Sequence, residues 1–264
     1  MEYFLIFYFG CIIGSFLNVV ILRLPREESL DGRSHCSNCQ HTLSWLDLFP
    51  LFSYLGLLGK CRYCKKAFSP RYFLIELLTG LLFLAAYAFL RPADLAGYLT
   101  LLKYAIALSA MVVVFMVDLE HMLIFDSVLL AAGLPVLAIN ILADYLAKNN
   151  VLSLASLTMG GLFAGGLFAG IFFLLWLVSR GAWIGFGDVK LMLVLGVMLG
   201  WPVTAVAWLL AYFLGTAFVL PLLALRKTHL SSRLPFGCFL SLAAAFCLFY
   251  GHQMASWYLR FLGF

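Results

Sequence analysis

The run Met111-Val-Val-Val-Phe-Met-Val-Asp118 closes the apolar stretch of residues 98–117, and stretches of this kind decide the fold class. The stretch contains about 20 mostly apolar residues, the length that a helix needs to cross a bilayer. The whole chain shares this character: 64% of its 264 residues are hydrophobic, 11% are charged, and the mean hydropathy is +1.04. This composition excludes an ordinary water-soluble domain and predicts an all-α polytopic membrane protein.

By the same length rule, we expect about eight transmembrane helices. They are placed at residues 3–22, 72–90, 98–117, 123–143, 156–178, 188–200, 203–225 and 235–250. The sixth is short because Gly200-Trp201-Pro202 favours a break in the helix. The chain opens without a basic segment or a small-residue cleavage site. We therefore expect the first stretch to be retained and not removed as a signal peptide.

The distribution of Lys and Arg predicts the orientation of these helices. Connections separated by two spans lie on the same side of the membrane. By this count one side carries most of the cations, namely Arg23, Arg26, Arg33, Lys60, Arg62, Lys65, Lys66, Arg71, Arg180, Lys190, Arg226, Lys227 and Arg233. The other side receives only Arg91, Lys148 and Arg260, while Lys103 lies within a span. Because cytoplasmic loops carry the excess of cations, the N-terminus is expected outside and residues 24–71 in the cytosol.

Residues 24–71 form the one long polar segment, between a first helix at 1–23 and a membrane bundle at 72–264. The segment is too short to bury an ordinary core. It contains two CxxC pairs, Cys36-Ser-Asn-Cys39 and Cys61-Arg-Tyr-Cys64. Four thiolates at this spacing are typical of a closed structural zinc site, so we predict a small cytosolic zinc-ribbon-like loop domain that folds with its metal.

A redox dithiol or disulfides are the alternatives for the two CxxC pairs, and a cytosolic location disfavours stable disulfides. Cys11, Cys238 and Cys247 lie in apolar spans, where packing is the expected role.

Two aspartates stand at the ends of spans on the expected cytosolic side. Asp118 follows an apolar span, and Asp188 opens another in Gly185-Phe-Gly187-Asp188-Val-Lys190. An ionisable residue beside hydrocarbon is costly and indicates a functional site. Two such carboxyls could act as an acid/base pair, in which the ionised member takes a proton from water and the protonated member donates to a peptide carbonyl.

Structural alternatives remain open at this stage. Asp188 could cap a helix. Asp118 could be a surface residue, with Glu120, His121 and Asp126 as rivals and Asp126 expected to cap the next helix. Lys190 could act on the site or extend to the interface. Repeated small residues, Gly10 with Gly14 and Gly161 with Gly165, Gly166 and Gly170, indicate close helix packing or a groove for a substrate helix. Asn18 and Glu76 are polar at membrane depth and could bond between helices or line a second site.

Taken in order, several motifs resemble those of the type IV prepilin peptidases, also called prepilin leader peptidase/N-methyltransferases. They are Gly14-Ser-Phe-Leu-Asn18 through Leu24-Pro25, the two CxxC pairs, Trp45-Leu-Asp47 through Tyr54, Ser69-Pro-Arg71 through Glu76, Asp118-Leu-Glu120, Gly185-Phe-Gly187-Asp188, and Leu234-Pro235-Phe236-Gly237. The resemblance covers nearly the whole chain. The sequence departs from the usual pattern at Leu48, Phe125 and Cys238, where the family often has Asn, an Ile-Pro-Asp step and Pro.

The resemblance implies a membrane aspartic protease of the bacterial inner membrane. Such an enzyme cuts the short basic leader from prepilin or pseudopilin precursors of type IV pili and type II secretion, at the cytosolic face. Many members then methylate the new N-terminal residue with S-adenosylmethionine. By this resemblance Asp118 and Asp188 correspond to the catalytic pair, and Glu76 is a candidate for the methyl-transfer site; the position of the methyl donor is otherwise left open.

Two other classes of function were considered. A proton-coupled membrane transporter would use the aspartates for coupling, but no inverted repeat is evident. A non-catalytic zinc-bearing membrane assembly factor would need only the cysteine segment. No glycine-rich nucleotide loop follows a strand, so methylation rests on the resemblance alone. The basic segment is explained by topology and anionic membrane lipid, and no nucleic-acid partner is expected.

Overall fold

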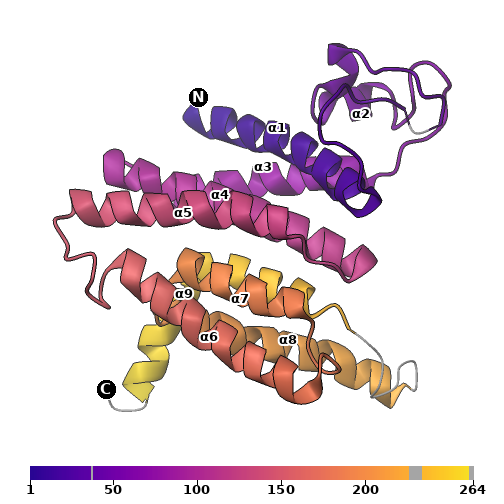
Figure 1. Ribbon diagram of the computed structural model, residues 1–264. Helices are drawn as coiled ribbons and strands as arrows, with labels where there is room; N and C mark the ends of the chain where they lie inside the picture. The colour runs from indigo at the N-terminus through magenta and orange to yellow at the C-terminus, as the bar shows by residue number, and fades with distance from the viewer. Residues whose placement is uncertain (37, 226–233, 262–264) are drawn as a thin grey trace. The chain divides into compact units, whose positions relative to one another are not determined.

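The computed structural model describes residues 1–36, 38–225 and 234–261. Within these ranges the chain is almost entirely helical and forms no strand beyond two isolated β-bridges (Figure 1). The α-helices are α1 (Glu2–Arg23), α2 (Phe52–Gly56), α3 (Arg71–Leu90), α4 (Leu95–His121), α5 (Asp126–Leu146), α6 (Leu157–Ser179), α7 (Phe186–Leu199), α8 (Val203–Ala224) and α9 (Phe236–Phe261). Short 3₁₀ helices η1 (Leu24–Arg26) and η2 (Trp45–Leu48) complete the set.

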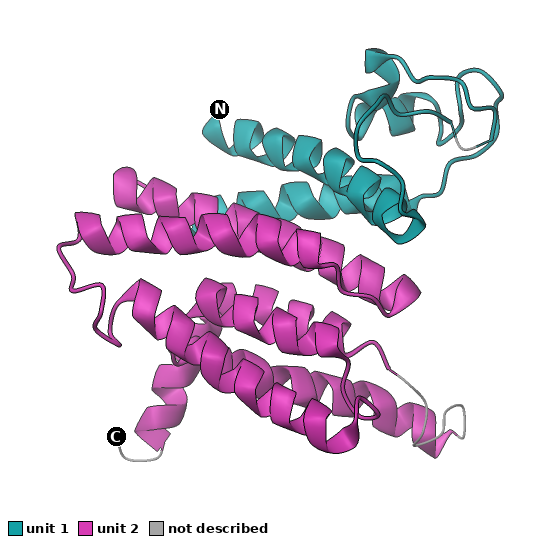
Figure 2. Cartoon of the chain, viewed as in Figure 1, with its two compact units in different colours: residues 1–91 teal, residues 92–264 magenta. Residues whose placement is uncertain are grey.

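The chain divides into two compact units, residues 1–91 and 92–264 (Figure 2). Unit 1 contains α1, the cysteine-bearing segment and α3, and unit 2 contains α4 to α9. Helix α3 thus belongs to the same compact unit as the cysteine segment, whereas the functional division expected from the sequence groups residues 72–264 together.

In unit 1, α1 packs directly on α3 because small residues face one another. A Cβ atom added at Gly10 would lie 2.9 Å from the Cα of Gly80, and one at Gly14 would lie 2.8 Å from the Cα of Glu76. Neither position has room for a larger side chain. The prediction of close packing by this glycine pair is confirmed.

In unit 2, α7 lies in the core between α5, α6 and α9. Leu191, Met192 and Leu195 of α7 are at most 1% exposed. Helix α6 approaches α7 through glycines, since a Cβ at Gly165 would lie 2.5 Å from the carbonyl oxygen of Leu193. By contrast, nothing lies within 4 Å of a Cβ added at Gly166 or Gly170, so only one of the two glycine repeats in α6 makes this contact.

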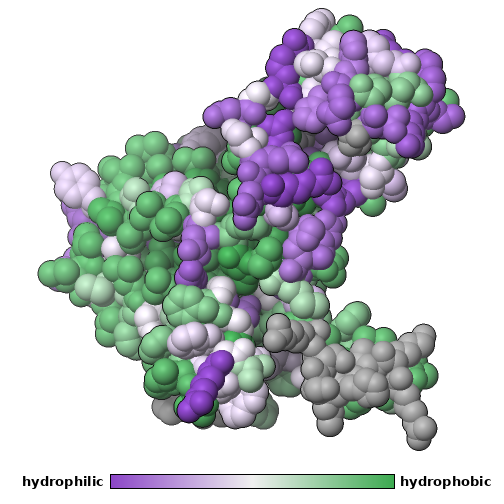
Figure 3. Space-filling view, turned by 45° about the vertical axis from the view of Figure 1, so that its right-hand side comes forward, coloured by the Kyte–Doolittle hydropathy of each residue, from purple (hydrophilic) through white to green (hydrophobic). Residues whose placement is uncertain are grey.

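Every predicted span corresponds to a helix, and the chain is a multi-pass membrane protein. Seven of the described helices are long and apolar enough to cross a bilayer. The eighth, α7, has only 14 residues, ends at Leu199 and is followed by Gly200-Trp201-Pro202, as the break in the sequence predicted. The helix surfaces are largely hydrophobic, whereas the surface of the cysteine segment is mostly hydrophilic (Figure 3). Of the cations used to assign orientation, Arg226, Lys227 and Arg233 lie outside the described residues.

Candidate functional site

Asp118 is a buried carboxyl in the last turn of α4, and only 5% of the residue is exposed. Its Oδ2 accepts a hydrogen bond of 2.9 Å from the backbone N–H of Cys238, in the first turn of α9. Gly237 allows this approach, because a Cβ at that position would lie 2.8 Å from the same oxygen. Its neighbours Glu120 and His121 are exposed. Burial therefore distinguishes Asp118 from the rivals that the sequence left open.

Asp188 is the third residue of α7. The N-cap position is Gly185, and no side chain caps this helix. Asp188 is therefore not the N-cap residue that the sequence also allowed. The Asp188 side chain instead bends back toward the start of the helix, where a Cβ added at Gly185 would lie 3.4 Å from its Oδ2. The carboxyl is thus held at the N-terminal turn, where the backbone of Gly185 interacts with it.

The turns that carry or contact the two aspartates approach one another at Ile124, which lies in the short link between α4 and α5. A Cβ at Gly187 would lie 3.0 Å from Ile124, and one at Gly237 would lie 3.1 Å from it. The side chain of Ile124 therefore fills the space between the start of α7 and the start of α9. Asp118 and Asp188 are close enough for the charge of one to act on the other. Unit 2 brings the two predicted site residues together at one end of the bundle.

Two predictions about nearby charged residues can be compared with the structure. Asp126 was expected to cap α5, and this is wrong: the cap position is Phe125, and Asp126 is the first helical residue. Both oxygens of Asp126 instead accept from Lys190 of α7, at 2.8 and 2.7 Å. This exposed ion pair gives Lys190 a partner and ties α5 to α7 beside the aspartates.

Tyr212 of α8 is a site neighbour that the sequence did not reveal. Its ring packs against Phe236, next to Gly237, with centroids 5.0 Å apart. Residues of α8 and α9 lie far from the Gly185–Asp188 motif in the chain, and an isolated Tyr in an apolar helix carries no pattern. Only the fold places it beside Asp188.

In unit 1, the four CxxC cysteines form a cluster with the geometry of a metal site. All four sulfur atoms lie within 4.8 Å of one another, and Cys36 and Cys64 are 3.9 Å apart. Tetrahedral zinc with Zn–S bonds of about 2.3 Å requires sulfur atoms about 3.8 Å apart. None of the described cysteines forms a disulfide. The donor set and spacing fit zinc, which would supply structural cross-linking to this segment.

The two halves of the cluster have matching backbone geometry. In the first, the N–H of Cys36 donates to His41 and that of Gln40 donates back to Cys36; in the second, Cys61 pairs in the same way with Lys66 and Lys65. Gln40 and Lys65 occupy the same left-handed conformation, with φ of 58° and 59°. The Lys66 backbone N–H, with the Asn38 amide, lowers the pKa of Cys64 to about 6, which favours the thiolate that a metal requires.

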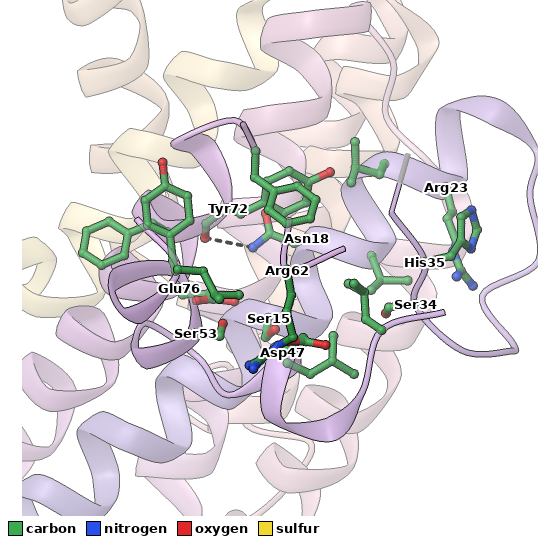
Figure 4. Close-up of a pocket in the computed structure, with 18 of the residues that line it drawn as sticks. Ser15, Asn18, Arg23, Ser34, His35, Asp47, Ser53, Arg62, Tyr72 and Glu76 are labelled. Atoms are coloured by element: carbon green, nitrogen blue, oxygen red, sulfur yellow. Dashed lines mark hydrogen bonds and ion pairs between the residues drawn. The ribbon is translucent and has the colours of Figure 1, made fainter. Parts of the chain in front are cut away.

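Beside the cysteine segment, unit 1 encloses a cavity of about 270 Å³ (Figure 4). Its walls come from α1, α3 and the segment between them, and include Ser15, Asn18, Asp47, Tyr72 and Glu76. Asn18 is 3% exposed and donates to the carbonyl of Tyr72, but its Oδ1 has no hydrogen-bond partner among the described residues. A buried acceptor without a partner is costly and points to a ligand group or water at that place.

Glu76 connects α3 to the cysteine segment through the backbone of Leu51. Its Oε2 accepts from the Leu51 N–H at 2.9 Å, and its side chain also bonds to Ser15. Leu51 adopts φ 62° and ψ −49° in a γ-turn closed by a 2.7 Å bond from Phe52 N to Pro50 O. Such a turn is strained for a non-glycine residue and needs support from its surroundings. Glu76 provides that support and bonds to a loop, not simply to a neighbouring span.

Comparison with known proteins fits the division of these two sites. Residues 8–90 match the model of the bacterial peptidase A24 N-terminal domain, and residues 105–220 match the type IV leader peptidase family. The prepilin leader peptidase/N-methyltransferase of Aeromonas salmonicida is 33% identical, over 97% of this chain and 93% of that protein. The chain belongs to the type IV leader peptidase family.

Further relatives of this family carry the same description. Those of Pseudomonas aeruginosa and Klebsiella pneumoniae are 30% and 34% identical, over 97% and 78% of this chain and 92% and 89% of theirs. No solved structure matches the chain. The cysteine cluster and the cavity lie in the part of the chain that matches the N-terminal domain, and Asp118 and Asp188 lie in the part that matches the leader peptidase family.

Proposed function

We propose that the protein is a leader peptidase whose catalytic residues are Asp118 and Asp188. The observation that carries the proposal is the position of both carboxyls at one end of unit 2, where the start of α7 and the start of α9 approach Ile124 and Asp118 is buried in an apolar bundle. Two carboxyls in such surroundings do not both ionise readily, so the pair holds one proton. Relatives are named prepilin leader peptidase/N-methyltransferase, which supports prepilin-like precursors as substrates.

The reaction follows from that shared proton. The ionised carboxyl takes a proton from a water molecule, and the oxygen of that water attacks the scissile carbonyl carbon. The protonated carboxyl donates its proton to the carbonyl oxygen. When the intermediate collapses, the protonated carboxyl gives its proton to the leaving amine, and the other carboxylate takes a proton from a hydroxyl of the intermediate, which restores the pair. The Lys and Arg distribution supports a cytosolic position for this end of the bundle, and the bacterial relatives support an inner-membrane location. The basic leader would then be removed on the cytosolic side.

The aspartates can be tested individually with an adjacent carboxylate as control. Asp118→Asn and Asp188→Asn should each lower leader removal at least ~100-fold, because losing one member removes the proton exchange. Asp126→Asn, which breaks only the exposed pair with Lys190, should retain nearly full cleavage. The measurement is mass spectrometry of a precursor pilin incubated with each variant in detergent. Near-normal cleavage by either of the first two variants contradicts the assignment and returns attention to a transporter or assembly role.

A second activity, methylation of the new amino terminus, is supported by the cavity in unit 1. We propose that it binds S-adenosylmethionine or the amine to be methylated, since Asn18 offers an unused acceptor and Glu76 a carboxylate. S-adenosylmethionine carries a positively charged sulfur and would supply the methyl group. Among the described contacts, Asp47 has Arg62 as its cationic partner at 2.6 Å, whereas Glu76 is bonded to a backbone N–H and a serine. A positively charged ligand would complete the surroundings of Glu76.

Two substitutions of Glu76 separate its charge from its structural bond. Glu76→Gln keeps an oxygen that can accept from Leu51 but removes the charge, whereas Glu76→Ala removes both. If the charge binds the methyl donor or acceptor, both variants should process precursor pilin and leave most of it unmethylated. If only the bond to Leu51 matters, Glu76→Gln should methylate normally. Mass spectrometry of the mature pilin distinguishes these outcomes, and fully methylated product from Glu76→Gln contradicts the proposed role.

A further inference from the structure

Residues 45–58 of unit 1 are strongly apolar although they belong to the segment between two spans. Their one ionisable acidic group is Asp47, whose side chain is 3% exposed and paired with Arg62. Several large apolar residues are exposed, including Trp45 at 69%, Phe52 at 58% and Leu55 at 58%. An exposed apolar patch of this kind indicates contact with something other than water.

The position of this patch along α1 shows how deep it lies. The rings of Phe49 and Phe52 are 5.9 and 6.2 Å from the ring of Tyr8. Tyr8 precedes Arg23, the last residue of α1, by fifteen positions, or about 22 Å of helix axis at 1.5 Å per residue. Helix α1 is a membrane span, and Arg23 marks the end at which residues 24–70 begin. The patch therefore extends back along the span toward its far end.

Helix α3 gives a second and shallower measure, taken at Leu51. Leu51 bonds to Glu76, which lies five positions, or about 7 Å, beyond Arg71 at the start of this span. Glu76 is also level with Gly14, about two and a half turns inside the Arg23 end of α1. Both spans thus place residues 49–52 beside their membrane-embedded parts. This holds whichever side of the membrane the N-terminus occupies.

The backbone of this segment is suited to a place without water. In hydrocarbon each N–H needs a partner. Those of Ser53, Leu55 and Leu57 donate to residues four or fewer positions earlier, and Pro50 has no N–H. Leu51, in the strained turn, donates its N–H to Glu76. A carboxylate at membrane depth, otherwise costly, here satisfies the turn that joins η2 to α2.

We propose that residues 45–57 form a re-entrant segment, which enters the bilayer at the face marked by Arg23 and Arg71 and contacts lipid acyl chains. Lipid is the occupant because the patch continues through Tyr8 to Phe4 of α1, whose ring stacks on Tyr8 and which is 62% exposed. Phe16 of the same span is 53% exposed. The segment also lines the cavity through Ser53, Tyr54 and Leu57 (Figure 4). If the proposed methylation is correct, its acceptor is therefore presented at membrane depth and not from free solution.

The depth of the segment can be measured in the full chain reconstituted in lipid nanodiscs. An environment-sensitive fluorescent amino acid is placed at position 52, at position 16 on the lipid side of α1, or at position 30 in the polar part of the same segment. Brominated acyl chains and aqueous iodide serve as quenchers. Position 52 should behave like position 16, with strong quenching by brominated lipid and little by iodide, and position 30 should show the reverse. Retained zinc content shows that each labelled protein is folded.

Two outcomes overturn the proposal. Iodide quenching at position 52 equal to that at position 30 places the segment in water. Protection from both quenchers means that protein covers the patch instead of lipid. Because the measurement reports depth and not methyl transfer, it succeeds or fails independently of the proposed activities.

Discussion

At the residue scale, burial separates side chains that look equivalent in the sequence. Asp118, Glu120 and Asp126 lie within nine positions, yet only Asp118 is buried, where the first turn of α9 donates to it. Asp126 is exposed and is engaged by Lys190. Spacing could not choose among them because the choice depends on Gly237 and Cys238, which lie more than a hundred positions away. The motif resemblance chose Asp118, and the geometry supplies a physical reason for it.

Asn18 offers a residue-scale prediction in which stability and binding should change differently. Replacing it with Ala removes a buried acceptor that has no partner, and leaving such a group unsatisfied costs about 1–3 kcal/mol. The free protein should therefore lose little stability despite the lost bond to Tyr72. If the acceptor binds the methyl donor, the S-adenosylmethionine concentration for half-maximal methylation should rise about tenfold, the loss of one hydrogen bond.

The control for Asn18 is Thr79→Val in α3. Thr79 is fully buried and bonds only to the carbonyl of Ile75 in its own helix, and it does not line the cavity. Thr79→Val should change stability slightly, and the S-adenosylmethionine concentration for half-maximal methylation should not change. A large loss of thermal stability in Asn18→Ala, with unchanged donor dependence, would show that Asn18 is a packing residue.

At the element scale, the two glycine repeats of α6 show what the sequence pattern contains and what it lacks. Both repeats have the same Gly-Leu-Phe-Ala-Gly form, and both predicted close helix packing. Only Gly161 and Gly165 face α7 closely, whereas Gly166 and Gly170 have open space around them. Helix periodicity fixes which residues share a face, but it does not reveal which face meets another helix.

This difference provides a matched pair of variants. A Cβ at Gly165 would lie 2.5 Å from the backbone oxygen of Leu193, so Gly165→Ala should force α6 and α7 apart and cost about 1–3 kcal/mol. Gly166→Ala adds the same methyl group where nothing lies within 4 Å and should be tolerated. Because α7 carries Asp188, Gly165→Ala should also reduce leader cleavage. Thermal unfolding in detergent and the cleavage assay should rank the two variants in the same order, and equal behaviour would contradict this packing.

At the whole-molecule scale, composition and span length predicted the helical membrane fold, because the backbone N–H and C=O groups of a span in lipid must bond to one another. The cysteine spacing likewise predicted a cluster that the four sulfur atoms now form. The cavity could not be predicted: its walls combine Ser15, Asp47 and Glu76, and no local pattern connects them. The same is true of the contact between Phe52 and Tyr8. Sequence reasoning succeeded where a feature is periodic or local and missed those that depend on tertiary pairing.

The division into two units leads to a final prediction about the two activities. The contacts described for Asp118 and Asp188 lie within residues 92–264, and the cysteine cluster and the cavity lie within residues 1–91. Cys61→Ser should remove zinc and loosen the cysteine segment, whose small size leaves it dependent on the metal. Methylation should then fall severely, while leader cleavage should fall much less. Cys247→Ser, at a buried cysteine of α9, is the control that should keep its zinc.

The measurement combines elemental analysis of the purified variants with mass spectrometry of pilin processed in cells. Mature but unmethylated pilin from Cys61→Ser is the expected product, because the aspartate pair keeps its own supports at Gly237 and Cys238. Full retention of zinc by Cys61→Ser would contradict the metal site. Loss of cleavage as complete as that of Asp118→Asn, in protein that is still inserted and has lost its zinc, would mean that the peptidase site requires the cysteine segment and that the two units do not work separately.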